Sequence, residues 1–76
     1  MNLDDRRFLR ELGIRLRQRR QALKYTQADL ARRCELHRTF IGSVERGERN
    51  VSILNLRLLA RALRVSLAEI IAGEKS

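Results

Sequence analysis

The sequence predicts an all-α protein that forms one small domain over residues 1–76. Three observations support this fold class. Apolar residues recur at the spacing of one helix face along most of the chain. Residues typical of helix N-caps precede several of the apolar runs. The chain has no proline and only four glycines, and no segment has the pattern of a strand or a linker.

The first helix is predicted at roughly residues 5–23. On a helical wheel, one apolar stripe contains Phe8, Leu9, Leu12, Leu16 and Leu23. The opposite side carries Arg6, Arg10 and Arg17. Asp4 and Asp5 stand at the amino end, where the helix dipole favours negative charge.

A second, short helix is expected at about residues 27–33, because Thr26 and Asp29 form a capping-box pattern. Residues 34–36 break the periodicity. A third helix follows at 38–46, with its apolar side made of Phe40, Ile41 and Val44. Gly47 ends it at a position that tolerates a left-handed backbone.

The fourth helix is predicted at about residues 53–63, with Ser52 as its cap. Its inward stripe is expected to contain Ile53, Leu56, Leu59, Ala60 and Leu63. Ser66 and Glu69 form a second capping-box pattern, which predicts a last helix near residues 67–72. Short helices with short connections pack as an all-α bundle.

The charge of the chain favours a polyanionic partner. Seventeen Lys and Arg face nine Asp and Glu, a net charge of +8. Such a basic domain is expected to bind nucleic acid or an anionic membrane surface. Only Lys24 and Lys75 are lysines, and the arginine fork suits phosphates and guanine edges.

The sequence has few residues that could serve in catalysis or bind a cofactor. One His, one Cys and dispersed carboxylates form no metal set and no triad, so we expect neither an enzyme nor a cofactor or small-molecule ligand. Cys34 and His37 are too few for structural zinc, which takes four ligands. A lone cysteine and the lack of an apolar run of about 18 residues favour a cytoplasmic protein without a membrane span.

The outward face of the third predicted helix suits a DNA groove. It carries Arg38, Thr39, Gly42, Ser43 and Arg46. Short polar groups around a residue without a side chain allow close approach to base edges in the major groove. Two short helices joined by a three-residue turn are typical of a helix-turn-helix. The alternative is an ordinary solvated helix face.

Three segments carry a family resemblance: residues 26–31 (TQADLA), 36–53 (LHRTFIGSVERGERNVSI) and 59–67 (LARALRVSL). The sequence resembles the lambda-repressor/Cro (XRE) helix-turn-helix family over about residues 9–72. This implies a five-helix lambda-repressor-like DNA-binding domain whose second and third helices form the helix-turn-helix. Residues 38–40 and the turn at 45–50 are most similar to controller proteins of restriction-modification systems.

The resemblance also implies roles for individual residues. Gln27 matches an anchor on the DNA backbone, and Arg38, Thr39 and Ser43 match the major-groove readers. Phe40 stands where controllers usually have tyrosine. The phosphate-holding turn corresponds to Arg46, Arg49 and Asn50, and the structural salt bridge to Arg20 and Glu45. The sequence departs from the family pattern at three positions. Lys24 replaces the usual glycine after the first helix, and Glu35 replaces the usual glycine or asparagine of the turn. His37 replaces the usual cap of the recognition helix.

A second apolar stripe on the fourth helix points to a dimer. Leu54, Leu58 and Ala62 lie roughly opposite the inward stripe, and Val65 and Ile71 are near them in the sequence. Together they could form a self-complementary patch, although singly exposed leucines are normal in small domains. The resemblance implies a homodimer on palindromic double-stranded DNA.

The leading hypothesis is therefore a sequence-specific transcriptional regulator, either a repressor or an activator/repressor switch. An antitoxin-type regulator that also binds a toxin is the alternative, but only residues 73–76 follow the last predicted helix. A membrane-surface protein is a third possibility. It is disfavoured because the core needs the apolar stripe of the first helix, on which Arg19 falls.

Overall fold

Five helices follow one another in the computed structural model, which describes residues 2–73. They are α1 (Leu3–Ala22), α2 (Gln27–Cys34), α3 (Arg38–Glu45), α4 (Ile53–Ala62) and α5 (Leu67–Ala72). No strand occurs among the described residues. The all-α fold and all five elements are confirmed; residues 1 and 74–76 of the predicted domain lie outside the described residues.

Side-chain caps begin four of the helices. The Thr26 hydroxyl accepts the Asp29 N–H at 3.0 Å, and the Asp29 carboxylate accepts the Thr26 N–H at 2.8 Å, which completes the predicted capping box. That backbone N–H holds the pKa of the Asp29 carboxyl below its ordinary value. Ser52 and Ser66 cap α4 and α5 as expected. Asn2, which was not predicted as a cap, caps α1, so this helix begins two residues before its predicted start.

Left-handed residues end three of the helices without glycine. Lys24, Glu35 and Arg64 have φ angles of 62°, 57° and 59°, each at a cost of roughly 1 kcal/mol. After each one, the next N–H donates to a carbonyl five residues back: Tyr25 to Arg20, Leu36 to Ala31 and Val65 to Ala60. These bonds satisfy carbonyls that a helix end otherwise leaves open, which offsets the strain.

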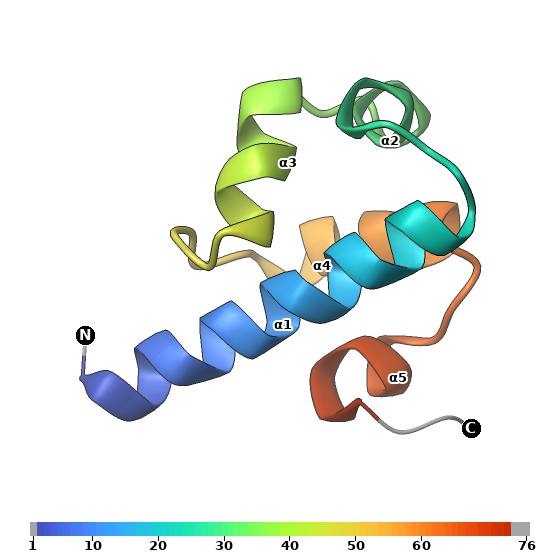
Figure 1. Cartoon of the computed structure of the whole chain (residues 1–76). Helices are drawn as coiled ribbons and strands as arrows, with labels where there is room; N and C mark the ends of the chain where they lie inside the picture. Colours follow the sequence, from blue (N-terminus) through green and yellow to red (C-terminus); the bar gives the residue numbers. More distant parts are fainter. Residues whose placement is uncertain (1, 74–76) are drawn as a thin grey trace.

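The core lies where α1, α2, α3 and α4 meet. Its fully buried large side chains are Leu16, Leu30, Ile41, Leu59 and Leu63. Two residues predicted to lie inside are exposed: Phe8 is 46% and Ile53 is 60% accessible. Phe8 belongs to the first turns of α1, which extend beyond the other helices (Figure 1), and Ile53 is the first residue of α4. A helical wheel carries no information on where the neighbouring helix stops.

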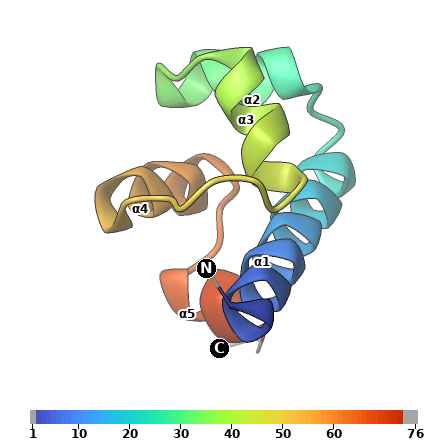
Figure 2. The same cartoon turned by 90° about the vertical axis from the view of Figure 1, so that its left-hand side faces the viewer.

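α1 runs through the molecule with helices on two sides of it. In both views, α2 and α3 lie on one side of α1 and α5 lies on the other (Figures 1 and 2). α1 contacts α3 and α5, whereas α4 contacts α2 and α5. The pair α2 and α3 is therefore supported from below by α1 and α4.

Two glycines allow the carboxyl end of α3 to touch α1. A Cβ atom on Gly13 would lie 2.5 Å from the carbonyl oxygens of Val44 and Glu45. Gly47 has a φ of 75°, and its Cβ would lie 2.7 Å from the Arg10 Cα. The backbones of α1 and of the end of α3 are thus in direct contact.

Two arginines of α1 bind the carbonyl ends of other helices. Arg15 donates to the carbonyls of Ile70 and Ile71 at 2.5 and 2.7 Å, and Arg19 donates to the Leu63 carbonyl at 2.7 Å. Cations are favourable at helix carboxyl ends. These arginines therefore fasten α4 and α5 to α1, whereas Arg6, Arg10 and Arg17 are solvent-exposed as predicted.

Replacing Gly13 with alanine tests the close contact between α1 and α3. We expect Gly13→Ala to lower the free energy of unfolding by about 1 to 3 kcal/mol, the usual cost of overpacking, because backbone oxygens cannot move aside. Chemical denaturation followed by circular dichroism measures this. Gly42→Ala is the matched control, since its new Cβ meets a flexible Arg46 nitrogen at 3.1 Å; it should leave stability unchanged or raise it by up to about 1 kcal/mol. Equal effects of both substitutions would contradict the account.

Candidate nucleic-acid interface

The first turn of α3 presents its polar side chains to solvent. Arg38 and Thr39 are exposed, and His37, which precedes them, makes no capping hydrogen bond through its side chain. Ser43 is half-buried one turn later, and its hydroxyl donates to the Phe40 carbonyl at 2.7 Å. This bond occupies the Ser43 proton, so the Ser43 oxygen can still accept a hydrogen bond from outside.

Phe40 links α3 to the turn that follows it. Its ring is half-buried and packs against the core, together with the buried Ile41 and Val44. The Arg49 guanidinium lies over the ring, with its carbon 5.5 Å from the ring centroid. This contact has the geometry of a cation–π interaction. Phe40 therefore helps to position Arg49, although it lacks the hydroxyl of the tyrosine usual in controllers.

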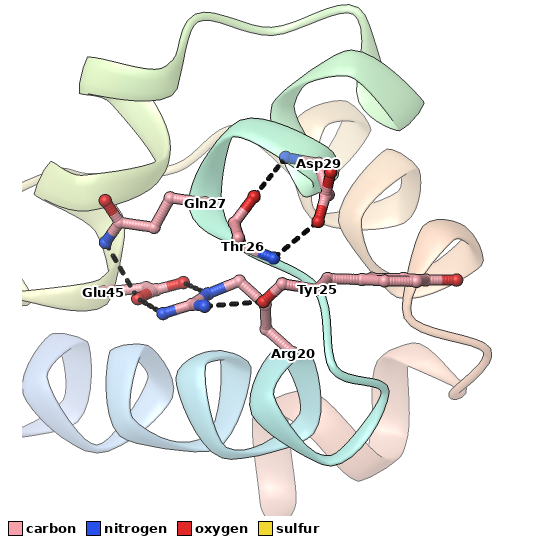
Figure 3. Close-up of polar contacts among 6 residues, drawn as sticks. All are labelled: Arg20, Tyr25, Thr26, Gln27, Asp29 and Glu45. Atoms are coloured by element: carbon pink, nitrogen blue, oxygen red, sulfur yellow. Dashed lines mark hydrogen bonds and ion pairs between the residues drawn. The ribbon is translucent and has the colours of Figure 1, made fainter.

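The Arg20–Glu45 ion pair joins α1 to α3 in the interior. Arg20 Nε donates to Glu45 Oε2 at 2.6 Å, and Nη2 donates to Oε1 at 2.9 Å. Arg20 Nη1 also donates to the Tyr25 carbonyl (Figure 3), and these two atoms are 2.8 Å apart. Both residues are 8% accessible, and the hydrogen bond to Glu45 raises the pKa of Arg20 despite burial. Arg20 is thus a structural residue, as the resemblance implies.

Gln27 extends this network to the surface. It is the first residue of α2, and its Nε2 donates to Glu45 Oε1 at 3.2 Å (Figure 3). Since a carboxylate only accepts hydrogen bonds, the Gln27 NH₂ group is directed toward Glu45. One N–H and the amide oxygen remain for an outside partner.

The sequence predicted that Gly42 lies open on the outward face of α3, and this prediction is wrong. It is buried, because two side chains cover it. A Cβ atom at this position would lie 3.1 Å from Arg46 Nη1 and 3.6 Å from Gln27 Oε1. Arg46 Nε in turn donates to Glu48 Oε1 at 3.1 Å. The centre of the outward face is therefore occupied by a guanidinium group.

The predicted interface residues fall into two sets. The first is the polar surface of α3, the start of α2 and the following turn; it contains Gln27, Arg38, Thr39, Phe40, Ser43, Arg46, Arg49 and Asn50. Arg49 and Asn50 are exposed in the turn after Gly47. The second set, the apolar residues predicted for the dimer, is spread over α4, α5 and the segment between them. Leu54 and Leu58 are 68% and 40% accessible on α4. Ala62, Val65 and Ile71 are half-buried.

The sequence also raised zinc binding and membrane association. Within residues 2–73, no three His, Cys, Asp or Glu side chains come together to hold a metal ion. Cys34 is buried, and burial raises the pKa of its thiol, whereas His37 is exposed. None of the described helices combines the length and the apolar character needed to cross a bilayer.

Breaking the buried ion pair tests its structural role. Glu45→Gln leaves the Arg20 charge buried without its partner, so the free energy of unfolding should fall by about 3 to 5 kcal/mol. Arg20→Met combined with Glu45→Leu should recover much of this loss. The control is Arg7→Met, which removes the exposed pair with Glu11 and should change stability by less than about 1 kcal/mol. Equal losses in Glu45→Gln and Arg7→Met would refute the role of the pair.

Comparison with known proteins identifies the family. The helix-turn-helix family model matches residues 16–70. Control protein C.SmaI from Serratia marcescens is 41% identical over 63 residues, which cover 83% of this chain and 75% of that protein.

Solved structures give the same result. The restriction-modification controller protein C.AhdI from Aeromonas hydrophila has a TM-score of 0.80 and 44% identity, over 82% of this chain and 94% of that one. The controller protein C.Esp1396I, solved as a tetramer with its natural 35 base-pair operator, has a TM-score of 0.77 and 32% identity, over 87% of this chain and 91% of that one. The chain therefore belongs to the helix-turn-helix family of the lambda-repressor/Cro (XRE) type, as its sequence indicated.

Proposed function

We propose that the protein is a sequence-specific transcriptional regulator that binds double-stranded operator DNA as a homodimer, in the manner of a restriction-modification controller. The observation that carries this proposal is the first turn of α3, where Arg38 and Thr39 are exposed on a helix fixed from beneath by the Arg20–Glu45 pair. The similarity to C.Esp1396I, which was solved on its operator, supports the same function. The protein acts in the cytoplasm by binding and catalyses no reaction.

α3 enters the major groove with its first turn foremost. The Arg38 fork can donate two hydrogen bonds to O6 and N7 of a guanine. Thr39 and Ser43 are short enough to reach base edges without holding the helix away. Gln27 donates its remaining N–H to a phosphate beside the groove, so that both N–H groups of its amide are bonded.

The turn after α3 holds the DNA backbone. Arg49 is steered by the Phe40 ring, and Asn50 is exposed beside it. Contacts with phosphates set the position and register of the protein on the duplex, whereas contacts with base edges set the sequence preference. The two groups of residues therefore have separable effects on binding.

Two copies are needed to read a complete operator. One recognition helix covers only a few base pairs, and two-fold dimers place two such helices about 34 Å apart along the duplex. We assign the dimer contact to Leu54, Leu58, Ala62, Val65 and Ile71. Leu54 and Leu58 leave apolar surface in water that a second copy would cover. One bound dimer would activate transcription, and a second dimer on an adjacent site would repress it.

Selection from a library of random duplexes tests the proposed function. Enriched duplexes should share a two-fold repeat whose half-sites lie about 10 base pairs apart. Lack of enrichment over the starting library would contradict sequence-specific binding. An enriched motif without two-fold symmetry would contradict the dimer.

Arg38 and Arg49 should differ in what they contribute. Arg38→Ala should cost about 1 to 3 kcal/mol on the selected duplex and remove the preference at one base position. Arg49→Ala should weaken binding to all duplexes alike and reduce the dependence of affinity on salt, because it releases a phosphate contact. Fluorescence anisotropy at several salt concentrations distinguishes the two. Equal losses on selected and scrambled duplexes for Arg38→Ala would exclude its role in base reading.

The apolar side of α4 can be tested through the oligomeric state. Leu58→Glu places a charge on this surface and should give a folded monomer by analytical ultracentrifugation at concentrations where the unaltered protein is a dimer. Ile14→Glu is the matched control, because Ile14 on α1 is 46% accessible compared with 40% for Leu58. The control should stay dimeric. A dimer mass for Leu58→Glu would refute the assigned interface.

A further inference from the structure

The side chain of Arg46 lies back along α3 and fills the space above Gly42. Its Nη1 atom would be 3.1 Å from a Cβ atom at residue 42, so any larger residue there would push the guanidinium away. Helical side chains point toward the amino end of their helix, which brings residue 46 over residue 42 one turn earlier. Gly42 thus forms a seat for the Arg46 guanidinium.

Glu48 determines how the guanidinium sits. It accepts a hydrogen bond from Arg46 Nε at 3.1 Å, and the two side chains are 60% and 58% accessible. An ion pair this exposed contributes little to stability, so its main effect is orientation. Within the described residues, no acceptor is bound to Nη1 or Nη2, and these two nitrogens form the end-on fork of the side chain.

We propose that Arg46 reads a base edge in the major groove, most favourably O6 and N7 of a guanine, in addition to the base contact of Arg38. This inference rests on the proposed function. It replaces the phosphate contact that the family resemblance implies for Arg46. Gly42 and Glu48 act as positioning residues: one provides the seat, and the other directs the fork.

Position and charge both favour a base over a phosphate. The Arg46 guanidinium lies over Gly42 on the outward face of α3, next to Gln27, and in the proposed docking this face is turned toward the base edges. Phosphates line the sides of the groove, near the turn that carries Arg49. Glu48 also neutralises part of the Arg46 charge and would itself repel a phosphate. The two terminal nitrogens of Arg46 still form a fork of fixed orientation, which suits the paired acceptors O6 and N7 of guanine.

Arg46→Lys separates the fork from the charge. Lysine keeps the positive charge but cannot donate two parallel hydrogen bonds. We expect affinity for the selected duplex to fall about tenfold, affinity for a scrambled duplex to stay within about twofold, and a repeated selection to lose the preference at a base position different from that lost in Arg38→Ala. Thermal unfolding should be unchanged, because both residues of the pair are exposed.

Gly42→Ala tests the seat through a double-mutant cycle. In the unaltered protein, Gly42→Ala should displace Arg46 and weaken binding to the selected duplex about as much as Arg46→Lys does. In an Arg46→Ala background it should have little further effect. Additive losses would mean that Gly42 serves the approach of the DNA itself, and they would overturn the seat.

Glu48→Gln tests the orientation of the fork. Removing the carboxylate should raise affinity for the scrambled duplex and reduce the ratio of selected to scrambled binding. An equal rise for both duplexes would overturn the positioning role of Glu48.

The base-reading role of Arg46 fails if Arg46→Lys keeps the full base preference, or if it loses affinity equally on both duplexes, while the unaltered protein remains selective. Failure of the proposed function looks different, because the unaltered protein itself would then bind selected and scrambled duplexes with the same affinity. That result would overturn both the proposed function and the base-reading role of Arg46.

Discussion

The bidentate ion pair between Arg20 and Glu45 is the contact on which the arrangement of the binding surface depends. It joins α1 to the last turn of α3 in the interior, and through Tyr25 and Gln27 it also fixes the start of α2. Removing one partner would leave a buried charge, so the helices cannot separate at this point without a large cost. The direct backbone contact at Gly13 acts between the same two helices. Together, the ion pair and the backbone contact hold the short, eight-residue α3 in a fixed position on α1.

A rigid support explains how so small a protein can present a defined polar surface. The exposed side chains of Arg38 and Thr39 are carried by a helix whose opposite side is buried, and Arg46 is held by a neighbouring glycine and glutamate. Charge is therefore used in three ways along this chain. Arg20 forms the buried ion pair, Arg15 and Arg19 bind helix carbonyls, and we propose Arg38, Arg46 and Arg49 as the arginines that bind DNA. The net charge of +8 therefore overstates the positive charge that one subunit would place against a duplex, and the proposed dimer would double the number of arginines at the DNA.

Much of the fold could be predicted because its signals are local. Caps such as Thr26 with Asp29 act within a single turn, so the starts of α2, α4 and α5 follow from the sequence alone. Phe8 and Ile53 could not be placed, since their exposure depends on where neighbouring helices end. Arg15 and Arg19 bind carbonyls that are more than forty residues away in the sequence, and no short sequence pattern predicts such contacts. The helical wheel gave the outward face of α3, and the family resemblance assigned roles to its residues and added Gln27 and the turn. Neither showed that the Arg46 side chain covers Gly42.

A crystal structure of the protein on its selected duplex tests the central claim most directly. The claim is that the buried network holds α3 as a preformed surface for the major groove. We expect the Arg38 side chain to lie in that groove with α3 unmoved, and Arg20 to remain bonded to Glu45 at the distances of the free protein. A complex in which the DNA lies against another face, or in which Arg20 leaves Glu45 for a phosphate, would contradict it.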